Sequence, residues 1–292
     1  MTLNWDWTGW ALWSTSHFWS VTLTVLIIVG ILEVFREAQP LLLPVWQRWS
    51  AHVFLTILIQ LCLNPLRAIS GHALAAWATS HQIGLFSLTS LPLGIRCILG
   101  ILLLDLIHYA SHFLYHHSSW LWSFHSIHHN DEDFDWSTGY RFHISESLVT
   151  LMIESIGVLI IGLPPESILL FVLLISIQNL VSHADFILPT PLARWLDCIW
   201  ISPNLHRLHH SDQIPHQQSN YGILLSLWDR LFGTLTPATP STLVSIRVGL
   251  TETHPHPINN PLRLLALPFL RHSHPDPNPD QRPYPQPDSQ TS

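Results

Sequence analysis

The sequence predicts an all-α fold, a multi-pass membrane helical bundle with a cytoplasmic helical cap that carries the histidine-rich segments. Three observations predict this class. Hydrophobic residues make up 48% of the 292 residues and charged residues only 11%, unlike the balance of a soluble domain. Four or five apolar runs approach the length of a membrane-spanning helix. Many of the histidines lie where these runs end.

The apolar runs cover residues 18–35, 51–66, 91–114, 147–163 and 168–181. Several are shorter than the roughly 20 residues that a span requires, so tilted, paired or re-entrant segments are expected among them. A buried helical bundle is the alternative interpretation of the same pattern. The N-terminus lacks the basic region and the small-residue cleavage site of a signal peptide, so we expect the first helix to stay in the membrane.

Arginine positions predict the orientation in the membrane, because positive charge near the ends of spans prefers the cytoplasmic side. If the first run begins outside, Arg36, Arg48 and every arginine from residue 141 to residue 230 lie inside. Segments 108–146 and 183–235, which hold most of the histidines, then meet on the cytoplasmic side. The absence of lysine and of an endoplasmic-reticulum retrieval signal favours a bacterial inner membrane.

Charge and cysteine content exclude several classes of protein. The 12 basic residues are all arginine, they form no block, and 19 acidic residues leave a net charge of -7, so we expect no nucleic-acid partner. Cys62, Cys97 and Cys198 show no CxxC spacing, which excludes a disulfide framework and a thiolate metal site. Any metal chemistry must therefore come from other side chains.

The spacing of the histidines indicates a metal site. Twelve of the 21 histidines lie between positions 108 and 210, in one H-x-x-x-H pair and two H-x-x-H-H motifs. Residues three or four apart share a helical face, so their imidazoles can reach one cation, and imidazole suits iron, zinc, copper and nickel alike. The candidate ligands from these motifs are His108, His112, His125, His128, His129, His206, His209 and His210.

Several further histidines lie outside these spaced motifs. His143 follows a predicted membrane boundary and His183 closes the last apolar run, so both are added to the candidate ligands. His116 and His117 either line the site or form a polar cap on their helix. His216 belongs to a loop and is a weaker candidate.

Carboxylates near the motifs are expected to support the ligands rather than to bridge metals, because the Glu-x-x-His pairs of soluble four-helix di-iron proteins are missing. Asp105, one turn before the first pair, is predicted to accept the N–H of a ligating imidazole. Glu146, three residues after His143, is predicted to do the same for that ring. Glu154 lies inside an apolar run, where an ionisable group is either functional or paired at a helix interface.

The chain resembles the fatty acid hydroxylase and sterol desaturase superfamily from about residue 98 to residue 236, nearly half of its length. The motifs that carry the resemblance are HYASH, HSIHH, RFHISE, SHAD, HRLHH and SNYGILLSLWDRLFGT. The resemblance implies a membrane oxygenase that holds two iron ions with the histidines above. It implies O2 as co-substrate and hydroxylation or desaturation at an unactivated C–H bond of a sterol, fatty acyl, carotenoid or related lipid.

One departure from the family pattern concerns Asn179, which stands where some members carry a histidine four positions before the counterpart of His183. Its side chain is expected to offer the metal a carbonyl oxygen or a water-mediated contact. Asp105, Glu146 and Asn179 are thus the candidate catalytic residues beside the metal ligands.

The resemblance also predicts the organisation of the chain and its partners. We expect a transmembrane region at 1–90, a catalytic domain at 91–236, an extension at 237–270 and a disordered proline-rich tail at 271–292. Neither a Rossmann motif nor a haem or iron–sulfur cysteine motif is present, so a separate electron donor of the ferredoxin or cytochrome type, with its reductase, must dock. The alternatives are a membrane metal-binding or metal-transport protein and a metal-dependent lipid hydrolase.

Overall fold

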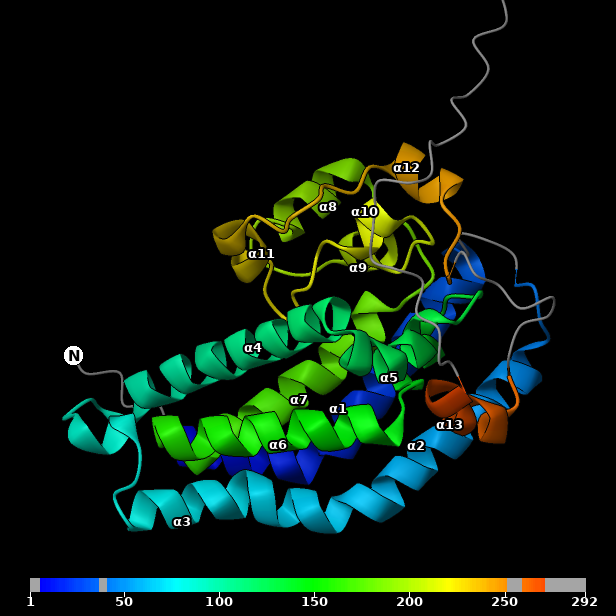
Figure 1. Cartoon of the computed structure of the whole chain (residues 1–292). Coiled ribbons are helices and arrows are strands. Elements are labelled where there is room, and N and C mark those ends of the chain that lie inside the picture. The colour runs from blue at the N-terminus through cyan, green and yellow to red at the C-terminus, as the bar shows by residue number, and fades with distance from the viewer. Residues whose placement is uncertain (1–5, 37–40, 251–258, 271–292) are drawn as a thin grey trace, which may run out of the picture.

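Long helices make up most of the structure, a computed structural model that describes residues 6–36, 41–250 and 259–270. These helices lie side by side and form an elongated bundle (Figure 1). Within the described residues the only β-type pairings are two isolated bridges. The five longest helices are α1 (Trp7–Arg36), α2 (Val45–Ala68), α4 (Leu93–His117), α6 (Ile144–Ile161) and α7 (Pro165–Ser182).

Helix α2 continues, after a break, into α3. A π-helical turn, η1 (Ile69–Ala73), joins α2 to α3 (Leu74–Ser80), and the backbone leaves helical geometry at Gly71, with φ -90° and ψ -109°. Pro65 lies inside α2 just before the break, where it removes a backbone donor and disturbs the helix. A short 3-10 turn, η2 (Leu85–Leu88), follows α3.

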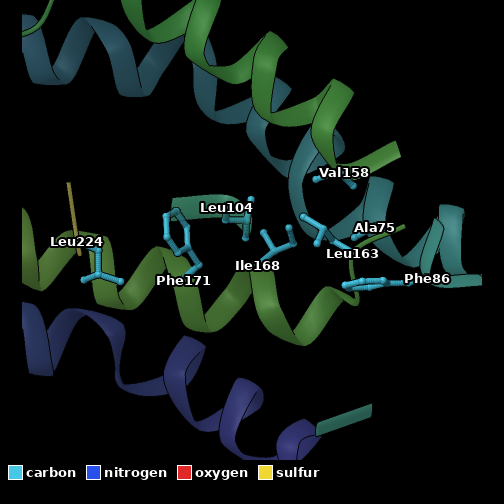
Figure 2. Close-up of a cluster of buried hydrophobic side chains, with 8 residues drawn as sticks. All are labelled: Ala75, Phe86, Leu104, Val158, Leu163, Ile168, Phe171 and Leu224. Atoms are coloured by element: carbon cyan, nitrogen blue, oxygen red, sulfur yellow. The ribbon is translucent and has the colours of Figure 1, made fainter. Parts of the chain in front are cut away.

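The apolar core of the bundle lies between α3, α4, α6 and α7 (Figure 2). Leu104 of α4, Val158 of α6 and Phe171 of α7 are almost fully buried there. Each fully buried side chain of this size contributes about 1.5–3 kcal/mol relative to an exposed one. This cluster fixes the positions of the helices that carry the histidines.

Shorter helices surround the end of the bundle where α4 and α7 finish, and α8 to α12 lie together beside the long helices (Figure 1). Ser118 caps the N-terminus of α5, and Ser202 caps the N-terminus of α9. Each serine side chain accepts a backbone N–H of its helix. The short elements are α5 (Ser119–His129), η3 (Trp136–Tyr140), α8 (Thr190–Leu196), α9 (Pro203–His209), α10 (Ile214–Gln217), α11 (Leu227–Phe232), α12 (Pro240–Ser245) and α13 (Pro261–Leu270).

The all-α membrane bundle predicted from the sequence is confirmed. Five helical segments are long and apolar enough to cross a membrane, so the chain is an integral membrane protein. Each is longer than the matching apolar run, because the helix continues through polar and aromatic residues at one end or at both. Their bounds are Trp7–Phe35, Val45–Leu88, Leu93–His117, Ile144–Ile161 and Pro165–Ser182.

The sidedness in the membrane, the type of membrane and the domain boundaries stay predictions. The predictions are that the histidine segments lie on the cytoplasmic side, that the membrane is the bacterial inner membrane, and that the domains divide at residues 90, 236 and 270. The predicted tail at 271–292 lies outside the described residues. The extension at 237–270 includes α13, which packs on α2 and α5 through Leu264 and Leu267.

Candidate metal centre

Nine buried histidines form two adjacent groups at one end of the bundle. Within each group, one ligand atom from every residue lies within 4.8 Å of the others. Segments far apart in sequence supply the rings, namely α4, α5, α9 and the end of α7. The first group contains His112, His116, His125, His129 and His209, and the second contains His128, His183, His206 and His210.

Each H-x-x-H-H motif serves both groups. In α5, His125 and His129, four residues apart, face the first group, whereas His128 faces the second. At α9 the arrangement is reversed, because His209 joins the first group while His206 and His210 join the second. The rings of His129 and His210 stack across the boundary, with centroids 4.4 Å apart. The three rings of a motif therefore do not share one cation.

Hydrogen bonds in the first group leave two nitrogen lone pairs facing each other. His112 Nδ1 lies 2.8 Å from the Tyr221 carbonyl oxygen, and His209 Nδ1 lies 2.7 Å from that of Ser219. Because a carbonyl oxygen only accepts, both Nδ1 atoms carry the proton and a neutral ring then has its lone pair on Nε2. These two Nε2 atoms are 3.0 Å apart. A cation between or beside them would relieve the repulsion.

The second group repeats this arrangement. His183 Nδ1 donates to the backbone carbonyl of Asn179 at 2.9 Å, which directs its Nε2 lone pair inward. That Nε2 atom lies 2.9 Å from His206 Nε2 and 3.2 Å from His128 Nε2. Three rings thus converge on one point.

Burial favours the neutral form of His183 and His209, which lie outside the spans. It lowers the pKa of His183 to about 4 and the pKa of His209 to about 3, because the interior disfavours the imidazolium form. Among the described residues, several ring nitrogens in the two groups have no protein partner, which is costly for buried polar atoms unless a metal binds them. They are both nitrogens of His116 and His129 and one nitrogen each of His125, His128, His206 and His210.

The donor set therefore fits two transition-metal ions, each held by neutral imidazoles. Iron, zinc and copper are all compatible with imidazole ligands.

From the sequence, His116 either lines the site or forms a polar cap on its helix. In the structure it lies in the first group. The predicted first pair thus moves by one turn, since His112 and His116 enter the group and His108 does not. His108 Nε2 instead lies 2.5 Å from Glu154 Oε1. All three positions follow one helical stripe, so spacing alone cannot choose between the two pairs.

His143 also lies outside both groups. It is the N-cap of α6, where its Nδ1 accepts the backbone N–H of Ser145 at 3.1 Å. Its Nε2 lies 3.2 Å from the Leu265 carbonyl oxygen, to which it donates. Both ring nitrogens are therefore engaged in holding α6 and α13.

Glu146 orients a different ring from the one predicted. Its Oε1 accepts from His125 Nδ1 at 2.7 Å, and both side chains are buried. The prediction for His143 was wrong because that residue caps the helix and its ring turns toward α13. Glu146 still acts as the carboxylate partner of a candidate ligand, which fixes the orientation of the His125 imidazole.

Asp105 does not accept from an imidazole, which corrects the predicted role. Its carboxylate takes the backbone N–H groups of Leu224 and Leu225, at 3.0 and 3.1 Å, and the indole N–H of Trp228 at 2.8 Å. Asp105 thus fastens the C-terminal segment onto α4. The side chain of Asn179 donates to the Gly139 carbonyl at 2.5 Å, and a contact of Asn179 with metal stays a prediction.

The N-Y-G turn positions His112 through its backbone. Asp229 accepts the N–H groups of Tyr221 and Gly222 at 2.8 and 2.7 Å, which holds the Tyr221 carbonyl in place for the ring. A Cβ atom at Gly222 would meet the Leu225 carbonyl at 2.6 Å, so only glycine fits. Asn220, two residues before this glycine, has a φ of 57°, a conformation that asparagine tolerates.

A buried ion network supports the segment that follows α5. Arg48 of α2 is fully buried and bonds Asp131 at 3.0 Å and Asp135 at 2.7 Å. Arg141 donates from Nε to the Ile127 carbonyl within α5. The arginines hold the pKa of Asp131 well below its usual range, since its carboxylate is stabilised by two nearby positive charges. The acidic run after HSIHH is the only sequence signal of this network.

A cavity of about 980 Å³ connects the two groups to the interior of the bundle. His112, His125, His128, His183 and His206 line one end, and Phe171 and other apolar side chains of the core cluster line its middle. Exposed residues of α1 and α2 also line it, so it opens sideways between these two helices. Its volume is that of a site for an organic molecule.

Comparison with known proteins agrees with this arrangement. Residues 97–234, which contain every histidine of the two groups, match the fatty acid hydroxylase family. This part of the chain is therefore similar to a fatty acid hydroxylase domain. No solved structure gives a significant match to the chain.

The proteins to which this chain is similar include three kinds of lipid hydroxylase or monooxygenase. Ornithine lipid hydroxylase OlsE of Rhizobium tropici is 29% identical over 82% of this chain and 73% of its own length. Cholesterol 25-hydroxylase of Homo sapiens is 27% identical over 65% of this chain and 70% of its own. Alkylglycerol monooxygenase of Danio rerio is 30% identical over 59% of this chain, but the match spans only 35% of that protein. These relatives support an oxidoreductase.

Proposed function

We propose that this protein is an O2-dependent lipid hydroxylase that holds two iron ions in the two histidine groups. The observation that carries the proposal is the convergence of neutral imidazole lone pairs at the inner end of a cavity that opens toward the membrane. Hydroxylation is favoured over desaturation because the relatives named above are hydroxylases or monooxygenases. Iron, when bound, would supply the redox chemistry with O2 that zinc lacks.

The side chains of the protein hold and orient the metals. His209 and His112 would bind one iron through Nε2, because backbone carbonyls take their Nδ1 protons. His183 would bind the other in the same way, and Glu146 keeps His125 turned toward the first group. Fixed tautomers of this kind raise the basicity of the ligands and keep their geometry when the metal leaves.

The cavity would bind the lipid and exclude water from the reacting carbon. A hydrocarbon chain that enters between α1 and α2 exchanges membrane lipid for the apolar walls formed by Leu104 and Phe171. The lipid carbon nearest the histidines would be the one oxidised. Electrons must come from an external donor of the ferredoxin or cytochrome type and its reductase, which we expect to dock on the cytoplasmic side.

The experiment that tests the proposal combines iron analysis with isotope labelling. Lipid extracts of cells with and without the gene identify the product, and the purified protein with 18O2 and a reductant should place one labelled oxygen in it. Close to two irons per chain are expected. Unlabelled product, or product formed anaerobically with zinc in place of iron, would instead indicate hydrolysis.

A further inference from the structure

A second polar cluster lies in the same cavity, away from the histidine groups. It contains the His108–Glu154 pair, in which Nε2 and Oε1 are 2.5 Å apart, and Arg67, whose Nη1 donates to Gln60 Oε1 at 3.3 Å. All four residues line the cavity, as does Asn64 of α2. They lie within predicted membrane spans, where ionisable groups are rare and mark binding sites.

Helix geometry gives the separation along α6 between two glutamates, one at each region of the cavity. Glu146, beside the first histidine group, and Glu154 are eight residues apart on α6. At a rise of 1.5 Å per residue they are separated by about 12 Å along the helix axis. A lipid could therefore contact both regions at once with two different parts of its structure.

The backbone beside this cluster is broken, which is a second, independent sign of a binding site. The π-helical turn η1 contributes Ser70, Gly71 and His72 to the cavity wall. Irregular backbone at membrane depth is tolerated where it lines a polar cavity, and broken helices form ligand sites in membrane proteins. The break therefore lies at the wall of the same cavity as the polar cluster.

Glu154 and Arg67, the acidic and basic residues of this cluster, differ in their partners. The Glu154 carboxylate already has a partner, because its Oε1 lies 2.5 Å from His108 Nε2. Glu154 also attracts Arg67 at longer range. Among the described residues, no carboxylate lies within ion-pair distance of Arg67, so its guanidinium has positive charge and free donors to offer a ligand.

We propose that Arg67, with the side chains of Gln60 and Asn64, binds an anionic carboxylate or phosphate group of the lipid substrate. The site rests on the proposed function, because it assigns one end of the lipid that the metal centre would oxidise. The anionic group would then be held in the part of the cavity near Glu154, about 12 Å along the α6 axis from Glu146, and this would restrict which carbon of the lipid reaches the metal centre. Arg67 is a specificity-determining residue in this scheme.

The test measures equilibrium binding to purified protein in a neutral detergent. Tritiated palmitate, 1-palmitoyl lysophosphatidate and methyl palmitate share one chain and differ only in the group at its end. Wild-type protein should bind at least one anion about tenfold or more tightly than the neutral ester, the ratio expected for one charge-assisted hydrogen bond. Whichever anion binds more tightly distinguishes a carboxylate ligand from a phosphate ligand.

Three variants and one control make the test specific. Arg67→Gln should abolish the preference for the anion, Arg67→Lys should retain part of it, and Glu154→Gln should increase it by removing a competing negative charge. Arg194→Gln is the control, because Arg194 is exposed on α8 and does not line the cavity. Iron content should be unchanged in all four proteins.

Equal affinity of the wild type for palmitate, lysophosphatidate and methyl palmitate would overturn the proposal, as would a preference that survives Arg67→Gln. Failure of the wild type to bind either anion would overturn it too. No turnover occurs in this assay. The anion site can therefore fail while labelled oxygen is still incorporated, and it can persist if the oxygenase function fails.

Discussion

The hydrogen bond between Glu146 and His125 offers a quantitative test of the metal centre. It joins two side chains that are 6% and 4% exposed, with Oε1 and Nδ1 2.7 Å apart. A hydrogen bond to a buried charged group is worth about 1.5–3 kcal/mol. Since 1.4 kcal/mol corresponds to a factor of ten in affinity, replacing Glu146 with Ala should weaken iron binding by about 10- to 100-fold. Carboxylate partners of metal-bound histidines contribute similarly in other proteins.

Competition with a chromophoric Fe(II) chelator measures this loss directly. Glu146→Gln retains an acceptor oxygen but loses the charge, so its iron affinity should lie between those of the wild type and Glu146→Ala. Glu166→Gln is the matched control, because that carboxylate accepts only from the exposed Thr8 hydroxyl among the described residues. Wild-type affinity in Glu146→Ala, or an equal loss in Glu166→Gln, would refute the reasoning.

Three further predictions follow from the same contacts. His116→Ala should lower the iron content measured by plasma mass spectrometry, whereas His108→Ala should leave two irons per chain; the reverse result would restore the pair predicted from spacing. Asp105→Ala leaves one buried and two part-buried N–H donors without their acceptor and should lower stability by about 3 kcal/mol, seen as a lower thermal midpoint in detergent. Removal of iron by a chelator should also lower that midpoint, because ligand binding stabilises only the folded state, and re-addition of Fe(II) should restore it.

The sequence predicts the helical bundle and most of the histidines for a physical reason. Both depend on local periodicity, in that apolar runs define the spans and separations of three or four residues put rings on one side of a helix. Periodicity could not choose between His108 and His116, because each is one turn from His112. The choice depends on α5 and α9, whose rings approach only the His116 end of the stripe.

The partners of the histidines are less predictable because they come from distant segments. Glu146 reaches back to α5, and Asp105 of α4 binds backbone groups more than 100 residues later. Local spacing assigns such carboxylates to the nearest histidine, which led to His143 as the predicted partner of Glu146. Only packing of helices against one another reveals the actual acceptors.

The division of each H-x-x-H-H motif between the two groups couples their assembly. Any shift of α5 or α9 moves ligands of both sites at once, so neither site can form while the other is disrupted. Filling of the first site would hold both helices in the positions that the second site needs. We therefore expect iron to load as a pair, with chains that hold a single ion scarce at every stage of a titration.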